Sequence, residues 1–311
     1  HRHPRARAHG YQQRIAGVEF AGAVFTNLTH DHLDYHKTFA EYRDAKKRLF
    51  DHLPASAFAL TNVDDKNGRF MLQNTAAKIQ TYGLKSPADF KAKIIENALH
   101  GLHLNLDGEA MHARLIGEFN AYNLTAVYAT ARLLGAEKME ALTAISGLRG
   151  AEGRFEALPH PAKPDCLGIV DYAHTPDALE QVLETIAQLK KRQTKVITVV
   201  GCGGDRDKTK RPIMARVAAR LSDQLILTSD NPRTEEPADI LRDMEAGLEK
   251  EDLSKTLTIE NREQAIKTAC RLAEAHAIVL IAGKGHEKYQ EIKGVKHPFD
   301  DKEIFMRYFN P

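Results

Sequence analysis

Four short apolar runs in the second half of the chain each stop at a loop rich in glycine, proline or charged residues. They span residues 167–170, 195–200, 224–228 and 277–282. The segments between them place apolar residues at helical spacing, as Leu179, Val182, Leu183, Ile186 and Leu189 do after the first run. Near-continuous apolar strands that alternate with helices predict a parallel sheet covered on both faces. We therefore predict an α/β fold for this half, a Rossmann-like doubly wound domain.

The loops after these runs have compositions that favour ligand binding. They read Asp-Tyr-Ala-His-Thr-Pro (171–176), Gly-Gly-Asp-Arg-Asp-Lys (203–208), Ser-Asp-Asn-Pro-Arg (229–233) and Gly-Lys-Gly-His-Glu (283–287). Loops at the carboxyl ends of parallel strands form the ligand crevice, so we expect these four to converge. The Arg233 guanidinium and the Glu287 carboxylate together suit a zwitterionic amino acid. Taken alone, either of these last two loops would be read as a surface ion pair or a tight turn.

The first half carries a polar string between a predicted strand and a predicted helix. Thr-Asn-Leu-Thr-His-Asp-His-Leu-Asp-Tyr-His occupies residues 26–36, directly after the apolar run 20–25. Apolar residues at helical spacing follow from Phe39 to Phe50, with Pro54 just beyond them. Three histidines and two aspartates in one loop are the composition of a metal or phosphate site. A solvated polar loop that caps the helix is the alternative reading.

Glycines mark a boundary near the middle of the chain. Before it, residues 58–62 and 78–82 are predicted strands, and alternating residues around Asp107-Gly108 predict a hairpin. Two helices follow, one opening at Gly117 and ending at Gly135, the other over residues 137–146. Glycines at positions 147, 150 and 153 then indicate a hinge. We predict two domains, residues 1–148 and 149–311.

Length and charge exclude several classes of protein. A chain of 311 residues is too long for one compact core and suits two domains. Its 44 basic and 42 acidic residues give a formal charge of +2, which argues against a nucleic-acid or membrane partner. Three scattered cysteines indicate a reducing compartment rather than a disulfide framework. The longest apolar run, 277–282, is too short to cross a bilayer. We predict a monomeric cytoplasmic protein.

Several strings occur in one order along the chain: the polar string 27–36, Gly-Arg-Phe-Glu at 153–156, and the four strand-end loops. Together they closely resemble the motifs of the Mur ligases, the ATP-dependent amino-acid ligases of peptidoglycan synthesis, from Gln12 onward. The resemblance implies the C-terminal portion of a central ATPase-type α/β domain, followed by the Rossmann-like domain that binds the incoming amino acid. It also implies ATP and Mg²⁺ as cofactors. Asp-Asn-Pro-Arg resembles the signature of members that add meso-diaminopimelate to UDP-MurNAc-L-Ala-D-Glu, which lysine-adding relatives lack.

The resemblance also implies roles for individual residues. His32 matches a magnesium-binding histidine, and Lys46 matches a lysine carried as an N-carboxylated side chain, whose oxygens suit Mg²⁺; both are expected to be catalytic. An ordinary solvated helix face is the alternative for Lys46. The matching diaminopimelate-binding positions are Arg206, Asp230, Asn231, Pro232, Arg233, Gly283 and Glu287. The matching ATP neighbours are Asn120, Asn123, Arg154 and His174, and Gln12 and Arg14 match contacts to the nucleotide-sugar substrate.

One family motif is absent from the sequence. No Gly-x-x-x-x-Gly-Lys-[Ser/Thr] phosphate loop occurs in the 311 residues, and relatives carry theirs upstream of the matching part. We therefore expect the C-terminal portion of the enzyme, unable to form ADP alone. Three hypotheses stay open: a ligase complete only with its missing portion, a non-catalytic amino-acid-binding fragment, and a related Mur or folylpolyglutamate-type ligase with another acceptor. Asp-Asn-Pro-Arg argues against the third.

Overall fold

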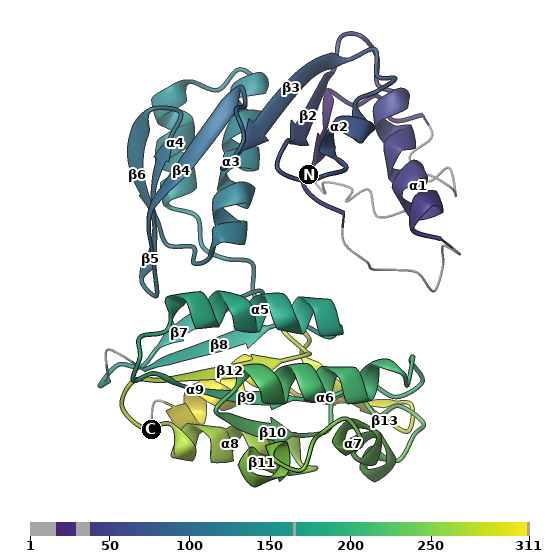
Figure 1. Ribbon diagram of the computed structural model, residues 1–311, viewed down its shortest axis with the longest axis vertical. Coiled ribbons are helices and arrows are strands. Elements are labelled where there is room, and N and C mark those ends of the chain that lie inside the picture. Colours follow the sequence, from purple (N-terminus) through teal and green to yellow (C-terminus); the bar gives the residue numbers. More distant parts are fainter. Residues whose placement is uncertain (1–16, 29–37, 164–165, 310–311) are drawn as a thin grey trace. The chain divides into compact units, whose positions relative to one another are not determined.

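Two compact units make up the protein. The structure is a computed structural model that describes residues 17–28, 38–163 and 166–309 (Figure 1). One unit spans His1–Leu148 and the other Arg149–Pro311, and each contains its own six-stranded sheet. Helices and strands alternate in both units, so the chain is a mixed α/β protein, as predicted.

The sheet of the N-terminal unit is parallel at one end and antiparallel at the other. Its strands lie in the order β1-β2-β3-β4-β5-β6, with β1 to β4 parallel and β4 to β6 antiparallel. They span Gly22–Phe25, Phe58–Asn62, Lys78–Gly83, Phe90–Ala98, Gly101–Leu106 and Glu109–Ala113. Asp107 and Gly108 have φ of 53° and 85° and join β5 to β6. These positive values confirm the predicted Asp-Gly hairpin.

The described helices of this unit are α1 (Phe39–Asp51), α2 (Gly68–Met71), α3 (Glu118–Leu133) and α4 (Lys138–Ser146). Helix α1 begins where it does because the Thr38 hydroxyl accepts the backbone amide of Glu41 (3.2 Å), an N-cap bond. Its Tyr42 and Phe50 side chains are buried in one apolar cluster with Phe25 of β1. The predicted strand before the polar string and the predicted helix after it are therefore confirmed.

Asp64, in the turn after β2, ties three elements of this unit together. Its carboxylate accepts the backbone amides of Leu84 (2.7 Å), Lys85 (2.9 Å) and Ser86 (2.7 Å), and the hydroxyl of Tyr122 in α3 (2.9 Å). Burial acts to raise the pKa of Asp64, but the hydrogen bonds outweigh burial and keep the pKa well below its ordinary value. The ionised carboxylate thus fixes the β3–β4 connection against α3.

The sheet of the C-terminal unit is parallel apart from one edge strand. Its order is β11-β10-β9-β12-β8-β7, and only β7 with β8 is antiparallel among its pairs. The strands are β7 (Glu156–Pro159), β8 (Leu167–Asp171), β9 (Lys195–Val200), β10 (Gln224–Leu227), β11 (Thr256–Thr258) and β12 (Ala277–Ala282). A separate antiparallel hairpin follows, β13 (Tyr289–Ile292) with β14 (Val295–Pro298). The four strands that the apolar runs predict, β8, β9, β10 and β12, are parallel as expected, and β7 adds an antiparallel edge strand that no run predicts.

Helices cover both faces of this sheet (Figure 1). Helices α5 (Pro176–Leu189), α6 (Lys210–Leu221) and α7 (Pro237–Glu245) pack side by side, and α8 (Arg262–Leu272) pairs with α9 (Asp301–Phe309). A short 3₁₀ helix, η2 (Asp252–Lys255), precedes β11. The chain leaves β9 toward α6 and leaves β12 toward α9. The carboxyl ends of these two neighbouring strands therefore flank the switch point where doubly wound sheets bind ligands.

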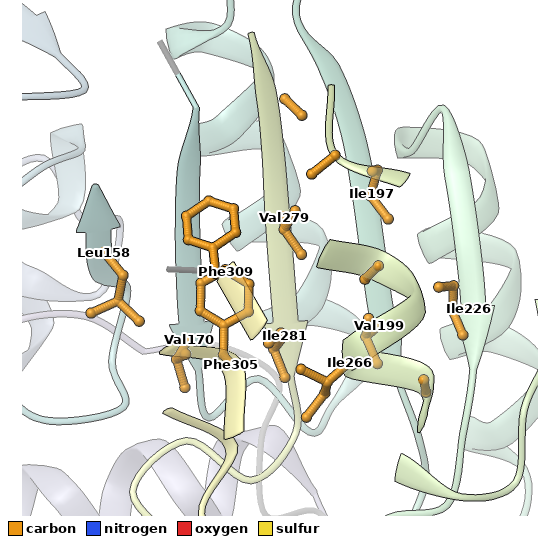
Figure 2. Close-up of a cluster of buried hydrophobic side chains, with 14 of the residues drawn as sticks. Leu158, Val170, Ile197, Val199, Ile226, Ile266, Val279, Ile281, Phe305 and Phe309 are labelled. Atoms are coloured by element: carbon orange, nitrogen blue, oxygen red, sulfur yellow. The ribbon is translucent and has the colours of Figure 1, made fainter. Parts of the chain in front are cut away.

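The core between this sheet and helices α8 and α9 is apolar (Figure 2). Sheet residues that include Val170, Ile197, Val199, Val279 and Ile281 meet Ile266 of α8 and the phenylalanines of α9. The rings of Phe305 and Phe309 stack with centroids 4.3 Å apart. Gly168 of β8 leaves space for them, because a Cβ there would lie 2.0 Å from the Phe305 ring. Each large side chain buried in this way contributes about 1.5–3 kcal/mol.

Two predictions made from composition are also checked by the structure. None of the helices within the described ranges combines the length and the apolar character that a bilayer crossing requires. Cys166, Cys202 and Cys270 are free thiols, in agreement with the absence of a predicted disulfide framework.

Candidate functional site

Loops at the carboxyl ends of the C-terminal strands meet one another, as predicted. The Gly283 amide after β12 donates to the Asp171 carbonyl at the end of β8 (3.0 Å). The Gly204 amide after β9 donates to the Asn231 carbonyl after β10 (2.9 Å). Gly153, from the loop before β7, packs so closely on Gly285 and His286 that a Cβ would lie 2.1 Å from the His286 nitrogen. We call these five segments the strand-end loops.

An aromatic and cationic cluster forms around Tyr172 in these loops. The ring centroids of His174 and His286 lie 4.6 Å and 5.1 Å from that of Tyr172. The Arg154 guanidinium carbon lies 5.5 Å from the same ring centroid. Flat π-systems next to a guanidinium can accommodate a planar base and an anionic group together. The structure thus brings together Arg154 and His174, the two ATP neighbours predicted in this unit.

Asp171, the last residue of β8, holds the backbone around this cluster through hydrogen bonds. Its carboxylate accepts the amides of Phe155 (2.6 Å) and Ala173 (2.7 Å). Burial raises the pKa of Asp171, although both amides oppose that shift. Phe155 has φ 45°, a left-handed conformation that costs a non-glycine residue about 1–3 kcal/mol and persists only where its surroundings fix it. Asp171 therefore fixes the loop that carries Arg154.

A buried lysine organises the opposite part of the strand-end loops. Lys284 is fully buried, and its ammonium donates to the Asn231 side-chain oxygen (3.0 Å) and to Glu287 (3.4 Å). Asn231 in turn donates its amide to the same Glu287 oxygen (2.8 Å) and accepts the Glu291 backbone amide (2.9 Å). Buried charges are stable only when they are paired in this way. The three side chains therefore form one network, in which a single oxygen of Glu287 accepts from both Asn231 and Lys284.

Arg233 lies in the same group of loops with a restrained backbone. Its φ is 53°, its amide donates to the Glu291 carbonyl (3.0 Å), and its carbonyl accepts the Lys293 amide (2.6 Å). The guanidinium Nη1 donates to the Gly204 carbonyl (2.6 Å), while Nε lies 3.9 Å from a Glu291 oxygen. A guanidinium has five N–H donors, so most remain to bind a carboxylate.

The other predicted diaminopimelate positions lie beside these two groups. The Asp230 carboxylate is buried; one oxygen accepts the Asn231 amide (2.6 Å), and the other would lie 2.7 Å from a Cβ on Gly283. Gly283 has φ 118°, so this close approach and this backbone both require glycine. A Cβ on Gly203 would lie 2.9 Å from the Arg233 Nη1 and 3.9 Å from the Arg206 Cγ. The two arginines therefore flank one glycine.

The predicted residues of the N-terminal unit are less completely placed. Gln12, Arg14 and His32 lie outside the described residues. Lys46 on α1 is partly buried, with its ammonium 4.9 Å from the Tyr42 ring centroid. Asn120 and Asn123 lie one turn apart on α3, where the Asn123 amide donates to the Asn120 oxygen (3.2 Å).

The implied magnesium site is not assembled within the described ranges. No group of three His, Cys, Asp or Glu side chains there is arranged to hold a metal ion. The Lys46 side chain lies against the Tyr42 ring, and His32 is outside the described residues. The described side chains thus do not provide the oxygen-rich set that Mg²⁺ prefers. We therefore propose no chemical step that involves a metal ion. A cavity of about 300 Å³ in this unit, lined by His100, His103 and His112 among others, contains none of the predicted site residues.

Some residues of the strand-end loops are not among the predicted positions. Lys284 stands inside the Gly-Lys-Gly-His-Glu motif, but a lysine between two glycines resembles a solvated side chain. Tyr172 likewise stands inside a quoted motif. Arg211 and Glu235 lie outside every motif, and only their contacts reveal them. For Lys284, the available signal is its place two residues after the end of the fully buried strand β12.

Comparisons with known proteins agree with this geometry. The model of the Mur ligase middle domain matches residues 6–131, and that of the Mur ligase glutamate ligase domain matches residues 153–285. The chain is 56% identical over 298 residues to the UDP-N-acetylmuramoyl-L-alanyl-D-glutamate--2,6-diaminopimelate ligase of Phocaeicola vulgatus, covering 96% of this chain and 61% of that protein. It is 58% identical over 293 residues to the protein of the same name from Cytophaga hutchinsonii, covering 94% and 60%.

Solved structures show the same fold. A structure of a UDP-N-acetylmuramoyl-L-alanyl-D-glutamate--2,6-diaminopimelate ligase superposes with a TM-score of 0.67 at 40% identity, covering 98% of this chain and 63% of that one. The UDP-N-acetylmuramate-alanine ligase of Thermotoga maritima superposes with a TM-score of 0.63 at 18% identity, over 93% and 59%, which supports the fold alone. The chain thus spans about three fifths of the length of the curated relatives it matches.

The fold is that of a two-unit α/β protein, and each unit is matched by a Mur ligase domain model. The chain belongs to the Mur ligase family.

Proposed function

We propose that this chain forms part of an ATP-dependent ligase that adds meso-diaminopimelate to UDP-MurNAc-L-Ala-D-Glu. The observation that carries the proposal is the Asp230-to-Arg233 loop, which presents a restrained guanidinium near the buried Lys284–Asn231–Glu287 network. Relatives at 54–58% identity are named for this reaction. Residues 1–148 then belong to the central ATP-binding domain, and residues 149–311 bind the incoming amino acid. The ligase acts as a cytoplasmic monomer.

Recognition of diaminopimelate follows from charge. Diaminopimelate differs from lysine by one carboxylate on the far carbon, and Arg233 supplies a fixed cationic donor for it, with Arg206 beside it. Glu287 keeps one oxygen without a contact among the described residues, which suits an ammonium. Asp230, Asn231, Pro232 and Gly283 set the loop geometry around these charges. A related ligase with another acceptor is disfavoured because it has no need of this arginine.

Arg154 and His174 are the proposed nucleotide neighbours in the C-terminal unit, and Asn120 and Asn123 are those in the N-terminal unit. Gln12 and Arg14 are the proposed contacts to the nucleotide-sugar substrate. ATP transfers its terminal phosphoryl group to the glutamyl carboxylate, and ADP leaves. The diaminopimelate amine then attacks the acyl phosphate, loses a proton, and inorganic phosphate leaves. Cationic side chains such as Arg154 stabilise the charge on the transferring phosphoryl group.

The proposal is tested with a fusion that completes the chain. The part of the Phocaeicola vulgatus relative that precedes the region matched to this chain is placed before it; we call the product the fusion ligase. ADP release is measured with ATP, UDP-MurNAc-L-Ala-D-Glu and meso-diaminopimelate. We expect turnover of about one per second or more that requires both substrates, and none from the 311-residue chain alone. A fusion ligase that is folded but does not respond to diaminopimelate would refute the proposed function.

Carboxylation of Lys46 is a separate proposal with its own readout. In the fusion ligase supplied with ¹³C-bicarbonate, we expect a carbamate carbon signal by NMR that Lys46→Ala abolishes, together with a fall in kcat of about 100-fold or more. Lys66→Met is the control, since Lys66 is an exposed lysine of the same unit. A signal that survives Lys46→Ala, or disappears in the control, would refute the assignment.

A further inference from the structure

The loops after β9 and β10 are joined through their backbones. The Gly204 amide donates a hydrogen bond to the Asn231 carbonyl. Gly204 also packs so tightly that a Cβ there would lie 1.9 Å from the Pro232 carbonyl oxygen. Arg233 donates back to the Gly204 carbonyl (2.6 Å). We call residues 203–208, which follow β9, the glycine loop. The position of the Arg233 guanidinium therefore depends on how the glycine loop packs against residues 229–233, the loop that contains Arg233.

Glu235 holds the two loops together. One carboxylate oxygen accepts the Asp205 backbone amide (2.7 Å) and the Arg211 Nη2 (2.8 Å), and the other accepts the Arg211 Nη1 (3.0 Å). The Lys208 ammonium lies 3.1 Å from the second oxygen. A two-pronged bond to guanidinium fixes the carboxylate in both distance and orientation.

Arg211 makes this contact from inside the fold. It is fully buried on α6 and also contacts Asp243 (2.8 Å) and the Gly203 carbonyl (3.4 Å). Its guanidinium therefore joins helix α6, the glycine loop and the Glu235 side chain. Arg233 donates to the Gly204 carbonyl of this same loop, so the Arg211–Glu235 pair and the Arg233 guanidinium contact one loop from different elements.

Thr234 adds two further hydrogen bonds between the loops after β9 and β10. Its amide and hydroxyl donate to the Asp205 carboxylate at 3.2 Å and 2.7 Å. Asp205 and Arg233 both have φ of 53°, so two left-handed residues are held opposite each other. Strained backbone of this kind needs surrounding contacts to maintain it, and Glu235 and Thr234 provide them.

We infer that Glu235, together with Arg211, is a positioning pair that sets the Arg233 guanidinium and so determines the choice of amino acid. The inference rests on the proposed function. Glu235 does not act as a ligand group, since its two oxygens are occupied by Arg211, Asp205 and Lys208. Hydrogen bonds from Arg211 lower the pKa of Glu235 to about 2, so the pair stays ionised at neutral pH.

The test measures binding of meso-diaminopimelate and L-lysine to the 311-residue chain by calorimetry. Glu235→Gln is expected to reduce the preference for diaminopimelate by about 10- to 100-fold, because small displacements of a binding group have effects of this size. Glu235→Asp, which keeps the charge but is too short to span both contacts, is expected to reduce it as well. Glu236→Gln is the matched control: the Glu236 carboxylate is exposed and pairs with Lys293 (3.3 Å), and the preference should not change.

A double-mutant cycle separates positioning from general damage. In the Arg233→Ala background, Glu235→Gln is expected to change the preference by no more than about 2-fold, because its effect acts through Arg233. A wild-type chain with no preference for diaminopimelate would refute the proposed function. A wild-type preference that Glu235→Gln and Glu235→Asp both retain, or that falls equally in the Arg233→Ala background, would refute the positioning role alone.

Discussion

Replacing Arg233 by alanine in the fusion ligase is expected to lower kcat/KM for diaminopimelate by roughly 30- to several-thousand-fold. Loss of the partner of a bound charged group costs about 2–5 kcal/mol, and Arg233 is the proposed partner of the distal carboxylate. Lysine lacks that carboxylate, so kcat/KM for lysine should change far less, and the KM for ATP should stay nearly constant. Arg233→Lys should show the same selectivity, because an ammonium cannot reproduce the two-pronged geometry.

The competing explanation is that Arg233 only braces its loop. Its Nε lies 3.9 Å from Glu291, and an ion pair of this kind contributes about 1 kcal/mol or less. Glu291→Gln is the matched control, since it removes this pair and keeps the guanidinium. If Arg233→Ala lowers the rate with both amino acids equally, or if Glu291→Gln reproduces its effect, Arg233 does not recognise the carboxylate.

Removal of the Asp301 carboxylate is expected to lower the free energy of unfolding of the C-terminal unit by about 3–5 kcal/mol. Asp301 accepts two bonds from Arg262, from Nε at 2.8 Å and Nη2 at 2.6 Å, and both side chains are fully buried. Arg262 also donates to the Ala282 carbonyl (3.1 Å), where β12 enters the strand-end loops. Without Asp301 the guanidinium remains buried and uncompensated, which is the costly half of a broken pair.

The measurement is native-state hydrogen exchange of the β12 amides in Asp301→Ala. Glu303→Ala on the same helix is the control, because Glu303 is exposed and pairs with Arg307 at 3.3 Å, a contact that contributes about 0.5 kcal/mol or less. Equal, small changes in the two variants would show that the buried pair does not support the strand-end loops.

The parts of the fold predicted from sequence are those that burial determines. The strands β8, β9, β10 and β12 are buried along nearly their whole length, so they read as apolar runs. Strand β14 is exposed at all four residues, and β11 is only partly covered. Such strands are defined by their pairing partners, which a local pattern does not contain. The same holds for β4, whose pairing with β5 is interrupted by a bulge near Ile94.

The candidate site shows the same division. The strand-end position of each motif predicts that the loops come together; Asn231 does meet Glu287, and Arg233 contacts the Gly204 carbonyl in the loop after β9. Sequence could not predict that Lys284 is buried between Asn231 and Glu287, or that Arg211 joins Glu235 from another helix. Those contacts depend on packing between segments that are distant in sequence. The roles of Gln12, Arg14 and His32 stay predictions, because they lie outside the described residues.

A competition experiment tests the proposed selection of diaminopimelate most directly. The fusion ligase is given ATP, UDP-MurNAc-L-Ala-D-Glu, and equal concentrations of meso-diaminopimelate and L-lysine. The product is then identified by mass spectrometry. We expect the nucleotide product to carry diaminopimelate, and we expect Arg233→Ala to lose this selectivity. A lysine-containing product from the unmodified fusion ligase, or no product from a folded one, would contradict the proposed selection.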